Sequence, residues 1–164
     1  MEWLGIELHP ETPPEGKAIT EMFRVEDTSR MMQHLRSMGA PYGIVFSDIV
    51  RISNSRLALQ AAEFAREQGR FEEFHSRLLQ AYFSGGLDIG DSEVLSQIAL
   101  ETGLDVKAME KALNEGTYLL TLKQVQEEAT RLGVTGVPAF FLGEKKAIVG
   151  AQSIDVFRKA LRGL

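Results

Sequence analysis

The sequence predicts a single α/β domain that carries a helical insertion, and three observations predict it. Short β-type apolar runs stand near both ends of the chain, at 2–8, 139–142 and 147–149. Between 54 and about 132, apolar residues recur at helical spacing. The resulting order of strand, helical block, two strands and helix is typical of an α/β fold with an insertion. A chain of 164 residues favours one domain and is long enough to bury a core.

The first thirty residues predict a strand and then a loop. Residues 2–8 mix apolar and acidic side chains and are followed by His9 and Pro10, so we expect a strand that ends before the proline. The next seven residues, 10–16, contain three prolines and one glycine, which can hold neither a ladder nor a helix. We therefore expect an extended loop there.

Helices are predicted from residue 25 onward. Methionine and leucine residues at 31, 32, 35 and 38 indicate a helix over 25–38 that ends at Gly39 and Pro41. Residues 42–52 are apolar but poor in helix formers, so we expect an irregular connector, although 43–46 could form a strand. Five helices then follow, with capping residues at Ser53 or Asn54, Asp91 or Ser92, and Asp105, and with ends at Gly69, Gly85-Gly86, Gly103, Gly116 and Gly133.

The last thirty residues predict two strands and a final helix after the helical block. Residues 139–142 and 147–149 predict an antiparallel hairpin that turns through 143–146. Ser153 is the expected cap of a final helix with Ile154, Phe157 and Leu161 on one side, and Asp155 in its first turn suits the helix dipole.

Charge and residue counts exclude several classes of function. Lys and Arg number 18 against 23 Asp and Glu, which gives a net charge of -5, so we expect no nucleic-acid partner. No apolar run is long enough to span a membrane, and the first residues do not resemble a secretion signal, so we expect a soluble, cytoplasmic protein without a membrane partner.

The chain contains no cysteine, which excludes a disulfide, a thiolate nucleophile and a cysteine-based metal site within it. The three histidines, His9, His34 and His75, are scattered, so we expect neither a metal site nor a cofactor. The carboxylates of Asp88 and Asp91 are interpreted as turn and cap groups, and the pair at 127–128 as a solvated helix face. The sequence thus offers no catalytic residue.

The most informative stretch is Gly133-Val134-Thr135-Gly136-Val137-Pro138-Ala139-Phe140. A proline at the very start of a strand is a candidate for a cis peptide bond, because only X-Pro bonds adopt cis at low cost. Composition alone favours trans, since about 5–6% of X-Pro bonds are cis. The flanking pattern raises the odds of cis.

Together with 148–152 and the closing helix, this stretch resembles the cis-proline loop, terminal hairpin and last helix of DsbA-type thioredoxin-fold proteins. The similarity is strongest to the FrnE-like branch, which contains dithiol-disulfide isomerases of polyketide biosynthesis. Three more segments carry the resemblance: 8–16, 53–58, and 81–83 with 88–91. The resemblance spans nearly the whole chain and implies a thioredoxin-like (DsbA-type) fold with a helical insertion.

The resemblance also implies a substrate site. It implies that Val137–Pro138 is cis and that Gly136, Val137 and Pro138 face a groove whose backbone pairs with an extended peptide, a protein thiol substrate or glutathione. Asn54 matches a position near the redox site of the family. Its alternative role is that of an ordinary helix cap, which the residues themselves favour.

One part of the family pattern is missing. Family members carry a strand, a Cys-x-x-Cys motif and a helix before the strand that matches 2–8, and this sequence begins at that strand. We therefore expect a truncated βα unit, with 1–16 and 134–164 as the remaining thioredoxin-like core and 17–133 as the helical connector and inserted domain. Without its ladder partner, the first strand should pair elsewhere or at an edge, so we expect a homodimer with 2–8 or the strand after Pro138 at the interface.

Three functions remain open from the sequence. In the first, the chain is a redox-inactive remainder of a thiol–disulfide oxidoreductase. The upstream DNA would then encode Cys-x-x-Cys or Cys-x-x-selenocysteine. Alternatively, it is a non-redox module that binds a peptide or glutathione. The third candidate is an enzyme similar to 2-hydroxychromene-carboxylate isomerases and kappa-class glutathione transferases, which ranks last because the position of its nucleophile is also missing.

Overall fold

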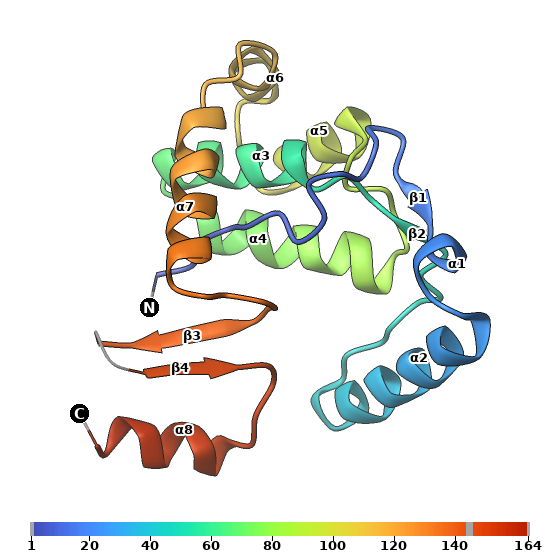
Figure 1. Cartoon of the computed structure of the whole chain (residues 1–164). Coiled ribbons are helices and arrows are strands. Elements are labelled where there is room, and N and C mark those ends of the chain that lie inside the picture. Colours follow the sequence, from blue (N-terminus) through green and yellow to red (C-terminus); the bar gives the residue numbers. More distant parts are fainter. Residues whose placement is uncertain (1, 144–145, 164) are drawn as a thin grey trace. The chain divides into compact units, whose positions relative to one another are not determined.

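The computed structural model describes residues 2–143 and 146–163. These residues form two compact units (Figure 1). One contains Met1–Leu8 and Lys123–Leu164, and the other His9–Leu122. We call them the terminal unit and the helical unit. The predicted domain limits of 1–16, 17–133 and 134–164 stay a prediction.

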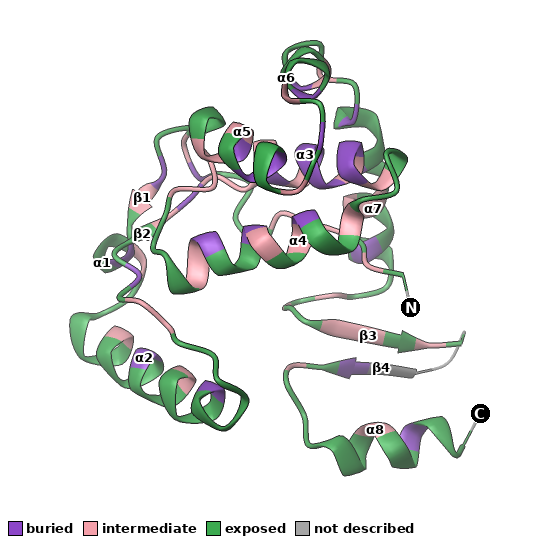
Figure 2. Ribbon diagram, turned by 180° about the vertical axis from the view of Figure 1, so that it is seen from behind, coloured by how far each residue is buried: buried purple, intermediate pink, exposed green. Residues whose placement is uncertain are grey.

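The helical unit is built around four helices and one π-helical turn. They are α3 (Arg56–Glu67), α4 (Phe71–Leu79), η2 (Gln80–Ser84), α5 (Ser92–Glu101) and α6 (Val106–Asn114). Their buried faces, coloured purple in Figure 2, share one core whose largest fully buried side chains are Phe74, Leu95, Ile98 and Met109. The predicted helices of this region are therefore confirmed, and α4 continues into η2 up to the predicted glycine stop.

Local capping explains where two of these helices begin. Asp91 accepts a hydrogen bond from the N–H of Glu93 at 2.8 Å, and Asp105 accepts one from the N–H of Ala108 at 3.0 Å. Each side chain satisfies a donor that the first turn of a helix leaves free. The sequence predicted both caps.

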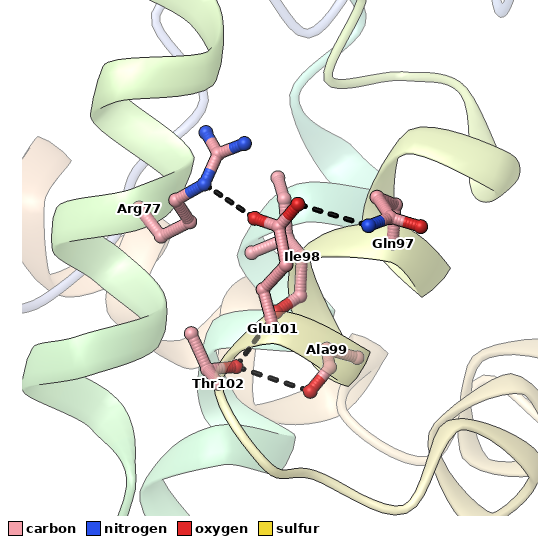
Figure 3. Close-up of polar contacts among 6 residues, drawn as sticks. All are labelled: Arg77, Gln97, Ile98, Ala99, Glu101 and Thr102. Carbon is pink, nitrogen blue, oxygen red and sulfur yellow. Dashed lines mark hydrogen bonds and ion pairs between the residues drawn. The ribbon is translucent and has the colours of Figure 1, made fainter.

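A cluster of polar contacts ties α4 to α5 (Figure 3). The Arg77 Nε donates to Glu101 Oε2 at 2.5 Å, and the Gln97 side chain donates to the other carboxylate oxygen at 2.9 Å. At the next residue, the Thr102 hydroxyl donates to the carbonyl groups of Ile98 and Ala99. The Arg77–Glu101 ion pair therefore holds the C-terminal turn of α5 against α4, and the other bonds lie within that end of α5.

The N-terminal part of the helical unit contains a second, smaller core. Its elements are β1 (Lys17–Ala18), α1 (Ile19–Met22), α2 (Val25–Gly39), η1 (Ala40–Tyr42) and β2 (Arg51–Ile52). β1 and β2 pair antiparallel, with Lys17 opposite Ile52. The buried centre of this core is Ile19, Met32 and Ile49. The predicted helix at 25–38 is confirmed, and the connector is irregular up to β2, a short strand that the sequence did not predict.

The terminal unit contains a hairpin and the last helix. β3 (Ala139–Leu142) pairs antiparallel with β4 (Lys146–Val149), with Phe140 opposite Ile148. The Phe140 ring contacts the Phe157 ring of α8 (Ile154–Leu161) edge to face at 4.9 Å between centroids. The predicted hairpin and final helix are confirmed. Residues 144–145 of the predicted turn lie outside the described residues.

Two expectations for the terminal unit are wrong. Ser153 stands at the N-cap of α8, but its side chain makes no capping hydrogen bond. Residues 2–8 form no strand. A strand needs a neighbour to satisfy its backbone groups, and the N–H of Glu7 donates instead to the side-chain oxygen of Gln126, at 3.0 Å, in α7 (Leu119–Arg131). The apolar pattern of 2–8 therefore does not lead to ladder pairing.

Candidate functional site

The loop before β3 carries three of the four predicted site residues. The Val137–Pro138 peptide bond is cis. The Val137 residue is 51% exposed, and a Cβ added to Gly136 would meet no atom within 4 Å. The carbonyl of Pro138 accepts a hydrogen bond from the N–H of Gly150 at 2.7 Å, which fastens the loop to the end of β4. The structure thus brings Gly136, Val137 and Pro138 together on an open, anchored loop.

The edge of β3 that faces away from β4 continues this loop. In an antiparallel pair, alternate residues direct both backbone groups to the partner strand. The Pro138 carbonyl bonds to Gly150, so Phe140 also faces β4, and Ala139 and Phe141 direct their N–H and C=O groups outward. Within the described ranges, β3 pairs with β4 alone, and the backbone of Val137 makes no hydrogen bond. The loop and this outer edge together form the candidate site.

Such an edge can recognise an extended peptide. Unpaired N–H and C=O groups at the rim of a sheet accept an added strand through main-chain hydrogen bonds. The side chains of Phe141 and Val149 are 43% and 49% exposed, so the sheet face away from α8 offers apolar contact beside the edge. The arrangement can bind a chain, but the 164 residues contain no thiol that could react with it.

Asn54, the fourth predicted site residue, belongs to the helical unit. The N-cap of α3 is Ser55, so the cap predicted at Ser53 or Asn54 was placed too early. The side-chain oxygen of Asn54 nevertheless accepts a hydrogen bond from the N–H of Arg56, the first residue of α3, at 3.0 Å. Its side-chain nitrogen donates to the carbonyl of Thr12 at 2.6 Å. Both ends of the amide are therefore engaged within the protein, and they join the start of α3 to the proline-rich loop.

Two arginines hold the same loop, which the sequence analysis did not anticipate. Arg51 donates to the carbonyl of Glu15, and Arg56 donates to the carbonyl of Pro10 at 3.5 Å. Together with Asn54, three side chains from 51–56 donate to carbonyl groups of 10–15. Prolines remove backbone donors, so side-chain donors supply hydrogen bonds that a ladder would otherwise make. The donors were visible in the sequence, but their partners were not.

The remaining candidates have structural roles. Asp88 accepts a hydrogen bond from the N–H of Gly90 at 2.9 Å, as expected of a turn residue. Glu128 pairs with Arg131 on an exposed helix face at 2.5 Å. The described residues hold no group of three histidine or acidic side chains that could bind a metal ion. In that same part of the chain, no helix is both long and apolar enough to cross a membrane.

Known proteins share this architecture. The family model for the DSBA-like thioredoxin domain matches residues 1–162. The Bacillus subtilis protein YwbO is 31% identical over 170 residues, which cover 98% of this chain and 80% of that protein. A probable DsbA oxidoreductase from Streptomyces coelicolor superimposes with a TM-score of 0.88 at 24% identity, over 96% of this chain and 72% of its own.

A second solved structure is more distant. A putative protein disulfide isomerase from Nitrosomonas europaea superimposes with a TM-score of 0.70 at 15% identity, over 86% of this chain and 74% of its own. At such identities the two solved structures establish the fold. The α/β thioredoxin-like fold that the sequence predicted is thus confirmed.

Proposed function

The chain belongs to the DSBA-like thioredoxin domain family, and from this premise we propose that it binds an extended peptide along the outer edge of β3 without exchanging disulfides itself. The observation that carries the proposal is the unpaired backbone of Val137, Ala139 and Phe141, at an exposed edge of the hairpin. An added strand would satisfy these groups, which no described residue satisfies.

The lack of cysteine explains why we expect this chain to carry out no disulfide exchange. Disulfide exchange proceeds through attack of a thiolate on a sulfur atom, and these 164 residues contain no cysteine. We expect the chain to leave the rate of insulin reduction by dithiothreitol unchanged, measured by turbidity. A faster reduction would contradict the proposal. Oxidoreductase activity of the DsbA type would require thiols that other residues supply.

The proposal also covers the branch of the family, the cellular location and the alternative ligand. The motifs at 8–16, 53–58 and 133–140 support membership of the FrnE-like branch. A cytoplasmic location stays a prediction from the sequence. Glutathione is the alternative ligand for the loop, because its peptide backbone can make the same hydrogen bonds as one residue of a strand. An isomerase or transferase activity has less support, since the three site residues Gly136, Val137 and Pro138 carry no nucleophilic side chain.

Peptide binding is tested by calorimetry with a matched pair of variants. The probe is a ten-residue peptide of alternating valine and threonine with a lysine at each end, since the protein is acidic. Val137→Pro removes the backbone donor, and Val137→Ala removes only the side chain beyond Cβ. We expect Val137→Ala to bind nearly as the parent does, and Val137→Pro to bind about fivefold more weakly, which corresponds to one hydrogen bond of about 1 kcal/mol.

A second measurement avoids any effect of the proline on the loop. Saturating peptide should slow hydrogen exchange at the amides of Ala139 and Phe141 in the parent protein, because both amides become donors to the added strand. Absence of saturable heat and of this protection would contradict the proposal. Binding of glutathione with no binding of the peptide would support the alternative instead.

A further inference from the structure

The face of the hairpin that points away from α8 carries one small side chain beside larger ones. Side chains alternate between the two faces of a strand, and Phe140 points toward Phe157 of α8. Ala139 and Phe141 therefore lie on the opposite face, together with Val149, which pairs with Ala139. Phe141 and Val149 are 43% and 49% exposed, whereas Ala139 offers only a methyl group. The side chains of this face are thus shortest at Ala139.

The same two residues of β3 form the edge at which a peptide would add. Ala139 and Phe141 direct their N–H and C=O groups away from β4. In either strand orientation, one residue of an added strand lies beside Ala139 on the same face, and the residue two positions away lies beside Phe141. These two ligand residues therefore meet different surroundings, a methyl group in one case and an aromatic ring in the other.

The ligand residue beside Ala139 has room for a large side chain. Opposite residues of neighbouring strands have Cβ atoms about 4.5–5.5 Å apart, and diagonal neighbours lie about 7–8 Å apart, a distance that aromatic side chains can span. Phe141 is a diagonal neighbour of this ligand residue. An aromatic ring at this place would cover the Ala139 methyl group and contact the ring of Phe141, whereas a valine or threonine side chain is too short to reach Phe141.

We propose that the site selects strands by one aromatic side chain, which lies over Ala139 and against Phe141, with a β-branched residue two positions away, beside Phe141. The inference rests on the proposed function, because only a strand bound at the outer edge of β3 brings a side chain to this place. Pairs of two aromatic residues, and of an aromatic with a β-branched residue, are favourable between strands. Glutathione carries no aromatic side chain and is therefore the poorer ligand.

Two peptides test this selection by calorimetry. One is the lysine-ended peptide of alternating valine and threonine, and the other has phenylalanine in place of one central valine. We expect the parent protein to bind the phenylalanine peptide about threefold more tightly, as a cross-strand contact of ordinary size would give.

A matched pair of variants locates the aromatic side chain. Ala139→Leu fills the place beside the edge, so this variant should bind the two peptides equally. The control, Ala108→Leu, makes the same enlargement at an exposed position of α6 and should keep the threefold preference. Circular dichroism checks that both variants are folded.

A second measurement needs no variant with altered binding. The methyl resonance of Ala139, in protein labelled with carbon-13 at alanine methyl groups, should move upfield when the phenylalanine peptide binds, because the ring would lie over this methyl group. The valine peptide should not cause this shift. The resonance is identified by its absence from the spectrum of Ala139→Leu.

The possible results separate this inference from the proposed function. Equal binding of both peptides by the parent would overturn the inference alone, since a strand would still bind at the edge. A preference that persists in Ala139→Leu, or an Ala139 methyl resonance that does not move, would overturn it as well. Absence of binding by either peptide would overturn the proposed function together with this inference.

Discussion

Replacing Tyr118 by phenylalanine tests how the helical unit is held together. The residue is 4% exposed and lies just before α7, and its hydroxyl donates to Glu67 Oε2 at 2.6 Å. Glu67 is the last residue of α3, 51 positions earlier in the chain. The bond therefore connects two parts of the helical unit that are distant in sequence, and Tyr118→Phe removes it while keeping the ring in the core.

The size of the effect follows from the surroundings of the two partners. A hydrogen bond to a charged group contributes about 1.5–3 kcal/mol, and more is lost when a buried partner is left unsatisfied. Glu67 is exposed, so water replaces the lost donor, and the phenylalanine ring leaves no cavity. We therefore expect Tyr118→Phe to lower the free energy of unfolding by about 1–1.5 kcal/mol at pH 7.

The difference should shrink at high pH. Burial, followed by the hydrogen bond and the negative charge of Glu67, raises the pKa of Tyr118 well above its usual value. The native state thus holds the phenolic proton more tightly than the unfolded state, in which the pKa is about 10. The associated stability is complete below pH 10 and is lost as the pH rises above it, whereas the variant has no such loss.

Urea unfolding at pH 7, 9 and 10.5, followed by circular dichroism, measures both effects. The control is Tyr42→Phe, because Tyr42 is 82% exposed and should contribute nothing measurable. Equal stability of Tyr118→Phe and the parent at pH 7 would refute the reasoning. A difference that is the same at pH 7 and pH 10.5 would refute the argument from the raised pKa.

Two further substitutions test contacts described above. Hydrogen bonds from Gln97 and then Arg77 lower the pKa of Glu101 below its ordinary value of 4.5, so the ionised group stabilises the fold above that pH. Glu101→Gln should be less stable than the parent at pH 7, and in urea titrations the difference should shrink as the pH falls below 4.5. Asn54→Ala should cost about 1 kcal/mol, because it removes both the hydrogen bond from the N–H of Arg56 in the first turn of α3 and the bond to the proline-rich loop. Asn54→Asp keeps the acceptor for Arg56 and should cost less. An alanine variant as stable as the parent would contradict the geometry.

The predictions that succeeded rest on short-range signals. The helix from 25 onward, the starts at Asp91 and Asp105, and the hairpin at 139–149 each depend on residues within a few positions of one another. Glycine stops, capping side chains and alternating apolar residues act locally, so the sequence displays them directly. The cis Val137–Pro138 bond was indicated for a related reason, since a compact motif carries the resemblance to the family, while substrate binding by Gly136, Val137 and Pro138 stays a prediction.

The failures involve partners distant in sequence. Residues 2–8 look like a strand, yet a strand exists only if another segment pairs with it, and their one described backbone bond goes to Gln126. The pairing of β1 with β2 joins segments 35 positions apart, from Lys17 to Ile52, and leaves no periodic pattern in such short strands. Asn54 was interpreted as a cap or a site residue, and its second bond, to Thr12, could not be read from its neighbours.

The sequence by itself therefore determined the family, the helices, the hairpin and the absence of thiol chemistry within these 164 residues. Only the tertiary structure decided which backbone groups stay unpaired at β3, which side chains hold the proline-rich loop, and that Tyr118 reaches Glu67. The physical reason is that capping and periodicity depend on neighbouring residues, whereas an exposed edge or a long-range hydrogen bond depends on which distant segments the fold brings together.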